Sequence, residues 1–112
     1  RPPIKPKNFD TFLPLGPFLV DAAAVPDPQA LAIRTYVNGE LRQEGNTRDM
    51  LYSVARLIEY VTGFMTLRED DVLLTGTPKG ISHLKAGDEV RCVVEGVGEL
   101  VNQVVAEEAL TG

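Results

Sequence analysis

Cysteine and histidine are almost absent from this chain, since each occurs once in 112 residues. The single cysteine, Cys92, cannot form an internal disulfide, which favours a reducing compartment, and we expect a cytoplasmic location. Because Cys92 lies in an apolar run from Val90 to Val94, we expect a buried small apolar residue rather than a reactive thiol. The single histidine, His83, argues against His-based zinc sites and Ser–His–Asp triads.

Long apolar runs and clusters of basic residues are also missing. No apolar run approaches the ~20 residues of a membrane span, and no stretch has the pattern of a signal peptide. The net charge is −5 and the basic residues are scattered, whereas a nucleic-acid or anionic-membrane surface needs a clustered basic face. We therefore expect neither a nucleic acid nor a membrane as a partner.

The first 17 residues are rich in proline, which predicts an extended or irregular path. Their beginning, from Arg1 to Lys7, is typical of a linker or of a cut into a longer polypeptide. At 112 residues the chain has the length of one domain or less, with a modest core. Phe18-Leu19-Val20 is a short apolar stretch that could pair as a strand.

Two hairpins are predicted. Asn38-Gly39 lies between two strand-like runs and is the strongest short hairpin signal, because a type I′ turn needs positive φ at both positions. The second hairpin is predicted by alternation from Glu89 to Glu95, a turn at Gly96-Val97-Gly98, and a return strand from Glu99 to Ala106.

One helix is predicted, over about residues 47–65. Apolar residues at positions 50, 51, 54, 57, 58, 61, 64 and 65 have helical spacing. Thr47 is expected as the N-cap, and Asp49 suits the first turn. The apolar stripe indicates packing on a sheet, which is far more common than a cofactor-binding stripe at this spacing. Together these elements predict an α+β fold, mostly β, with one long helix.

The most informative stretch is Leu74-Thr75-Gly76-Thr77-Pro78-Lys79-Gly80, which follows a predicted short strand, Val72-Leu73-Leu74. Glycines let the backbone approach a ligand closely, and loops on a rigid scaffold carry binding and catalysis. Its hydroxyl and backbone N–H groups could hold a small anion. The loop has no acid, histidine or cysteine, so it cannot carry acid–base or metal chemistry alone. The preceding acids, Glu69-Asp70-Asp71, are expected in a solvated turn rather than a cation site.

Lys7 lies at the start of a second candidate segment, which is bounded by prolines and also contains Asp10 and Thr11. A lysine close to carboxyl and hydroxyl groups in a stiff loop could hold an oxyanion or a carboxylate. Most lysines are solvated charges, so Lys7 alone is a weak signal.

Five ordered motifs resemble the fumarylacetoacetate hydrolase family in order and spacing, and they cover essentially the whole chain. They are Lys7-x-Phe9-Asp10-Thr11-Phe12, Pro14-Leu15-Gly16-Pro17, Val37-Asn38-Gly39-Glu40-x-x-Gln43, Thr47-x-Asp49-Met50 and Thr75-Gly76-Thr77-Pro78-x-Gly80. The stretches from Arg1 to Lys5 and from Leu31 to Gly45 resemble the family's isomerase/decarboxylase branch of homoprotocatechuate breakdown most closely.

The resemblance implies mixed, mostly β sheets around a site for a divalent metal, usually Mg²⁺ and otherwise Mn²⁺ or Ca²⁺. A Glu-x-Glu pair and a later Asp hold the metal in the family, and a 2-oxo or enol acid substrate chelates it. The resemblance places Lys7 and Thr11 beside the metal, with Lys7 as a catalytic and substrate-binding residue. It places Thr77, with Gly76, against the substrate carboxylate. In such a site the metal stabilises an enolate, lysine adds charge or proton transfer, and the threonine loop fixes the carboxylate.

The activity that the resemblance implies belongs to aromatic catabolism. It is decarboxylation of 5-oxopent-3-ene-1,2,5-tricarboxylate and isomerisation of 2-hydroxyhepta-2,4-dienedioate. The alternatives are a non-catalytic fragment or interaction module, a C–C bond hydrolase of acylpyruvate type, and an unrelated small-anion-binding β domain.

The acidic metal ligands that the resemblance implies would lie upstream of Lys7, and no residue of the chain matches them. We therefore expect residues 1–112 to be the C-terminal part of a single catalytic domain, inactive alone. We also expect a homo-oligomer or a pairing with the upstream part. Asp70 stands where the family usually has glycine, a mild change because Asp tolerates positive φ.

Overall fold

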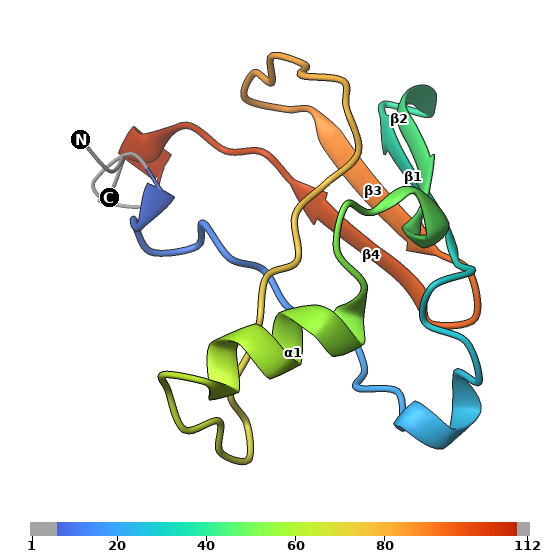
Figure 1. Cartoon of the computed structure of the whole chain (residues 1–112). Coiled ribbons are helices and arrows are strands. Elements are labelled where there is room, and N and C mark those ends of the chain that lie inside the picture. Colours follow the sequence, from blue (N-terminus) through green and yellow to red (C-terminus); the bar gives the residue numbers. More distant parts are fainter. Residues whose placement is uncertain (1–6, 110–112) are drawn as a thin grey trace.

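One four-stranded sheet and one α-helix form the framework of the computed structural model, which describes residues 7–109 (Figure 1). The strands are β1 (Ala32–Val37), β2 (Glu40–Asn46), β3 (Glu89–Val94) and β4 (Gly98–Gln103), and the helix is α1 (Val54–Thr62). Three short 3₁₀ helices are η2 (Ala22–Ala24), η3 (Thr47–Asp49) and η4 (Glu107–Ala109). The predicted class, α+β and mostly β with one helix, is confirmed.

The sheet has the order β2-β1-β3-β4 and is antiparallel throughout. The described residues therefore contain no parallel strand pair of the mixed kind that the resemblance implies. Both predicted hairpins are present. Asn38 and Gly39 have φ values of 50° and 80°, as the first turn requires. In the second hairpin the return strand ends at Gln103 rather than at Ala106.

Asp88 ties the two hairpins together and is one of the few buried side chains, with 4 % of its surface exposed. Its Oδ1 accepts a hydrogen bond from Asn38 Nδ2 at 2.8 Å, and its Oδ2 accepts one from Lys85 N at 2.9 Å. Asn38 Oδ1 in turn accepts from Glu89 N at 2.9 Å. The Lys85 N–H and then the Asn38 amide hold the pKa of Asp88 below its ordinary value, against the opposing effect of burial.

The helix is shorter than predicted and begins at Val54, with Ser53 rather than Thr47 as its N-cap. The Ser53 side chain accepts a hydrogen bond from Arg56 N at 3.0 Å. Thr47 is held elsewhere, because its N–H donates to Leu31 O at 2.9 Å and its Oγ1 accepts from Leu31 N at 3.0 Å. These bonds continue the alignment of the β1–β2 hairpin, so the prediction of a helix from residue 47 is wrong.

Three smaller predictions are also wrong. Neither Val72–Leu74 nor Phe18–Val20 forms a strand, since neither pairs with a described strand. Cys92 is exposed rather than buried, although Val90 and Val94 on the same face of β3 are half-buried. The irregular path predicted for residues 1–17 is confirmed from residue 8 onward, where no helix or strand occurs up to Pro17, and residues 1–6 lie outside the described part.

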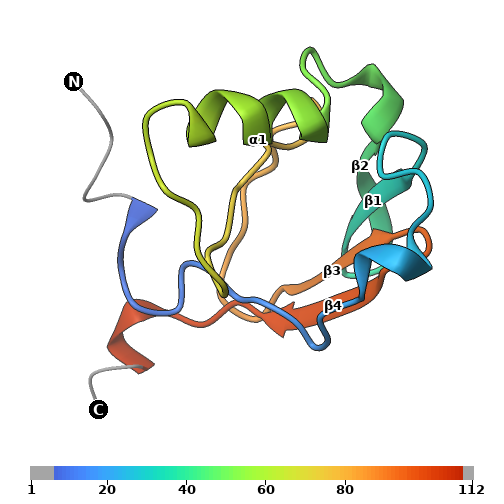
Figure 2. The ribbon, with the colours of Figure 1, turned by 60° about the horizontal axis from the view of Figure 1, so that its bottom comes forward.

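Very little of the apolar surface is buried. Val37, at 2 % exposure, is the one buried hydrophobic residue among those described, while Leu19 and Ile81 are 97 % and 98 % exposed. The accessible surface is 9330 Å², against about 6,100 Å² for a compact protein of this size. Figure 2 shows α1 and the sheet on different sides of the molecule, joined by long extended segments. The sheet and the helix therefore leave much of their apolar surface exposed to solvent.

Helices able to cross a membrane do not occur within residues 7–109, since none there combines the needed length with the needed apolar character.

Candidate functional site

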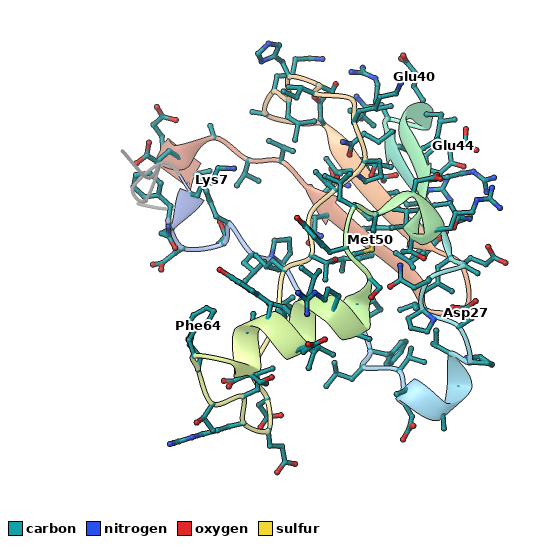
Figure 3. All side chains as sticks on the ribbon, viewed as in Figure 1. Lys7, Asp27, Glu40, Glu44, Met50 and Phe64 are labelled. Carbon is teal, nitrogen blue, oxygen red and sulfur yellow. The ribbon has the colours of Figure 1, made fainter. Side chains whose placement is uncertain are left out.

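A cavity of ≈ 600 Å³ lies beside the edge strand β2. In Figure 3, Met50 of its wall lies between the sheet and α1. The wall is built from β1, β2, η3, the approach to α1, and the threonine loop, here defined as residues 75–80. Its lining residues are Ile33, Glu44, Gly45, Asn46, Thr47, Asp49, Met50, Leu51, Tyr52, Leu57 and Thr75 to Lys79.

The tip of the threonine loop offers hydrogen-bond donors that have no partner among residues 7–109. The backbone N–H groups and hydroxyls of Thr75 and Thr77, and the N–H of Gly76, donate to no described residue. Gly76 has φ of 99°, and an added Cβ there would meet nothing within 4 Å. Open space beside several unpaired donors is the arrangement that binds a carboxylate or another small anion.

The remainder of the loop is fixed to β2. Gln43 Nε2 donates to Pro78 O at 3.0 Å. Gly45 allows Pro78 to lie against the strand, because a Cβ at this glycine would come within 2.7 Å of Pro78 Cγ. A Cβ on Gly80 would lie 3.1 Å from Arg42 O. Beyond the loop, Arg42 also donates to the Ser82 hydroxyl. Residues 75–77, whose donors have no described partner, are therefore followed by residues 78–80, which are held against β2.

The threonine loop carries the positive charge of the cavity lining. Lys79 is the basic residue of the lining and makes no ion pair with a described residue. Of the two acids in the lining, Glu44 is paired with Arg34 at 3.2 Å, and Asp49 belongs to η3. Lys79 therefore brings a positive charge next to Thr77 in the chain, while the negative charge of Asp49 lies in another part of the wall, at η3.

The structure brings together part of the predicted site. Gly76 and Thr77 line the cavity, whereas Lys7 and Thr11 are exposed and do not line it. Figure 3 places Lys7 well away from Met50. The cavity therefore supports Thr77 as a site residue. It gives no support for placing Lys7 and Thr11 in the same site.

Gly45 and Gln43 were missed as residues that shape the site. Gly45 carried a signal, because an isolated glycine within a strand often marks close approach of another backbone. The hydrogen bond from Gln43 to Pro78 had no sequence signal, since the two residues are 35 positions apart.

A metal site cannot be assembled from the described residues. No group of three or more His, Cys, Asp or Glu side chains gathers anywhere within residues 7–109. The acids Glu69, Asp70 and Asp71 form the predicted turn, in which Asp71 Oδ2 accepts from Arg68 N at 2.7 Å and Asp70 has φ of 69°. Mg²⁺ or Ca²⁺ needs about six oxygen ligands, so these residues alone do not fit such an ion.

The family model of the fumarylacetoacetate (FAA) hydrolase C-terminal domain matches residues 1–105. The chain belongs to this family. Among its relatives, the 4-hydroxyphenylacetate degradation bifunctional isomerase/decarboxylase of Salmonella dublin is 52 % identical over 109 residues. The mitochondrial oxaloacetate tautomerase FAHD2B of Bos taurus is 47 % identical over 106 residues. The resemblance found in the sequence is confirmed.

Solved structures of family members share the fold. The 2-hydroxyhepta-2,4-diene-1,7-dioate isomerase of Mycobacterium marinum matches with a TM-score of 0.86 at 40 % identity, over 92 % of this chain and 40 % of that one. The maleylpyruvate hydrolase of Sphingobium sp. SYK-6, in complex with a manganese(II) ion and pyruvate, matches with a TM-score of 0.85 at 41 % identity, over 87 % and 37 %.

The chain spans only part of the length of these family members. It covers 25 % of the Salmonella dublin enzyme and 34 % of the Bos taurus enzyme, although the matches take up 97 % and 88 % of the chain itself. The family is thus shown across almost the whole chain, while most of each relative lies outside the match.

Proposed function

We propose that the threonine loop forms the wall that binds the carboxylate of a 2-oxo or enol acid in an enzyme of the fumarylacetoacetate hydrolase family. The observation that carries this proposal is the loop tip, where Thr75, Gly76 and Thr77 line a cavity and their donors have no partner among the described residues. Pyruvate, which accompanies the related maleylpyruvate hydrolase, is the simplest 2-oxo acid and supports this choice of ligand.

The reaction that fits best is decarboxylation or isomerisation of a dicarboxylic or tricarboxylic 2-oxo acid from aromatic catabolism. It is supported by the similarity to the 4-hydroxyphenylacetate degradation enzyme, with 5-oxopent-3-ene-1,2,5-tricarboxylate and 2-hydroxyhepta-2,4-dienedioate as proposed substrates. A second candidate is C–C bond hydrolysis of an acylpyruvate, which the similarity to maleylpyruvate hydrolase favours.

In this proposal residues 1–112 are the C-terminal part of a single catalytic domain. A divalent metal, Mg²⁺ or in its place Mn²⁺ or Ca²⁺, would be held mainly by carboxylates outside this chain, because the described residues lack the donors. We assign no step to a metal held by residues 7–109. The role of the threonine loop is to bind: the Thr77 hydroxyl and the Gly76 N–H donate to the carboxylate, and Lys79 attracts it. Lys7 is proposed as the catalytic residue.

Partners and location follow from the same proposal. In this proposal the upstream part of the same polypeptide covers the exposed apolar surface. The complete enzyme is proposed to be a cytoplasmic homo-oligomer. A covered surface of this kind would account for the large exposure of Leu19 and Ile81 in the chain by itself.

Replacing Thr77 by valine tests the carboxylate wall. Thr77→Val removes one hydroxyl at nearly constant size, so in the complete protein KM should rise by roughly tenfold while the folded state is retained. The measurement is steady-state kinetics together with the melting temperature. Thr35→Val on β1 is a matched control outside the cavity wall and should leave KM unchanged. An equal KM in Thr77→Val and the parent protein would refute the role of this hydroxyl.

Replacing Lys7 by methionine tests the catalytic role proposed for this lysine. Lys7→Met keeps the length of the stem and removes the charge and the proton, so turnover should fall by roughly 10²-fold or more while Mg²⁺ stays bound. Turnover and Mg²⁺ affinity, the latter by calorimetry, are measured on the same complete protein. Loss of Mg²⁺ binding together with turnover would instead make Lys7 a structural part of the metal site.

A further inference from the structure

The attachment of the threonine loop to β2 is centred on one side chain, that of Gln43. We propose that Gln43 is a positioning residue, which sets the orientation of the loop tip so that Thr77 and Gly76 meet the substrate carboxylate. This inference rests on the proposed function of the loop.

The hydrogen bond from Gln43 fixes the loop next to its tip. Gln43 Nε2 donates to Pro78 O at 3.0 Å, and both residues are half-buried. Proline has no N–H and a fixed φ, so its carbonyl is the one backbone group through which the strand can hold Pro78. Because Thr77 directly precedes this proline and is restricted by it, holding Pro78 also restricts the path of Thr77.

Two glycines on either side of this bond let the loop approach closely. The position of a Cβ on Gly45 lies 2.7 Å and 2.9 Å from Pro78 Cγ and Cβ, and that on Gly80 lies 3.2 Å from Gln43 Cγ. The Cγ of Gln43 therefore lies next to Gly80, and its side-chain amide reaches the carbonyl of Pro78. The same side chain contacts the loop on both sides of Lys79.

The other polar attachment is weaker. Arg42 donates to Ser82, but this contact is exposed and lies beyond the loop. Exposed pairs contribute little to stability, whereas a half-buried carbonyl that loses its donor is costly. Loss of Gln43 should therefore release the loop even though the Arg42 contact remains.

Trypsin reports release of the loop directly, because Lys79–Gly80 is a cleavage site within it. In the full-length protein, Gln43→Leu should increase the rate of cleavage after Lys79 by roughly tenfold, relative to cleavage after Arg68, which lies outside the loop. It should also weaken binding of pyruvate, used as the probe, by a similar factor. Gln103→Leu is the matched control, since Gln103 is a strand glutamine whose amide bonds to Glu89 at 3.4 Å away from the cavity. It should change neither quantity.

Gln43→Glu supplies a signature that a general loss of stability would not give. It has the shape of glutamine, but its carboxylate cannot donate to Pro78 O at neutral pH, whereas the protonated acid can. Relative cleavage after Lys79 should therefore be fast at pH 7.5 and should slow as the pH falls toward the ordinary glutamic acid pKa of about 4.3, while Gln43→Leu stays fast throughout.

The outcomes separate this inference from the proposed function. Unchanged cleavage after Lys79 in Gln43→Leu would overturn the positioning role, whatever the loop binds. Faster cleavage with unchanged pyruvate affinity would show that Gln43 holds the loop but that the loop is not the carboxylate wall, which overturns the proposed function. Faster cleavage with weaker pyruvate binding supports both.

Discussion

Expressed by itself, the 112-residue chain should lack a sharp unfolding transition and should bind the dye 8-anilinonaphthalene-1-sulfonate strongly. The reason is its surface of 9330 Å², about half as large again as that of a compact protein of this size. Secondary structure should persist, because the two hairpins have favourable turns, but near-ultraviolet circular dichroism should be weak. The isolated chain should also be inactive as an enzyme.

Co-expression with the upstream part of the polypeptide is the control for this experiment. The two pieces should co-purify, and the complex should unfold in one cooperative step with much weaker dye binding. A cooperative transition and little dye binding for the isolated chain would show that its apolar surface needs no cover, and would contradict the proposal that residues 1–112 are part of a larger domain.

The second large effect is expected from Gly80→Ala. Gly80 has φ of 117°, a value that L side chains rarely adopt, and an added Cβ would lie 3.1 Å from Arg42 O and 3.2 Å from Gln43 Cγ. Backbone strain and crowding should together lower the free energy of unfolding of the complete protein by about 2–5 kcal/mol. Urea denaturation measures this change.

Gly87→Ala separates the two causes. Gly87 has φ of 94°, but an added Cβ would meet nothing within 4 Å, so this variant carries the strain without the crowding. Its loss should be about 1–3 kcal/mol and should be smaller than that of Gly80→Ala. An equal loss of unfolding free energy in the two variants would contradict the close contact between the threonine loop and β2.

Turns determined by local chemistry could be predicted from the sequence. Asn38-Gly39 dictates its hairpin because both residues tolerate positive φ, and Asp70 adopts positive φ in the turn before the loop. The small residues of the threonine loop marked the candidate site for the same reason, since only their types and order were needed.

Features that depend on distant partners could not be predicted. Thr47 looks like an N-cap, yet its hydroxyl accepts from Leu31, and no local signal shows this choice. The alternation of β3 located the strand but not how well each position is covered, so the exposure of Cys92 between the half-buried Val90 and Val94 was not foreseen. The hydrogen bond between Gln43 and Pro78 likewise depends on the fold that brings β2 to the loop.

The bridge between Asn38 and Asp88 has a consequence for the kinetics of folding. Each hairpin can form from neighbouring residues, but joining β1 to β3 closes a segment of 50 residues, with the entropy cost that such closure carries. Both α1 and the threonine loop lie inside that segment. We therefore expect the hairpins to form early and the central strand pairing late, with the contact between Gln43 and Pro78, which closes only 35 residues, between these two steps.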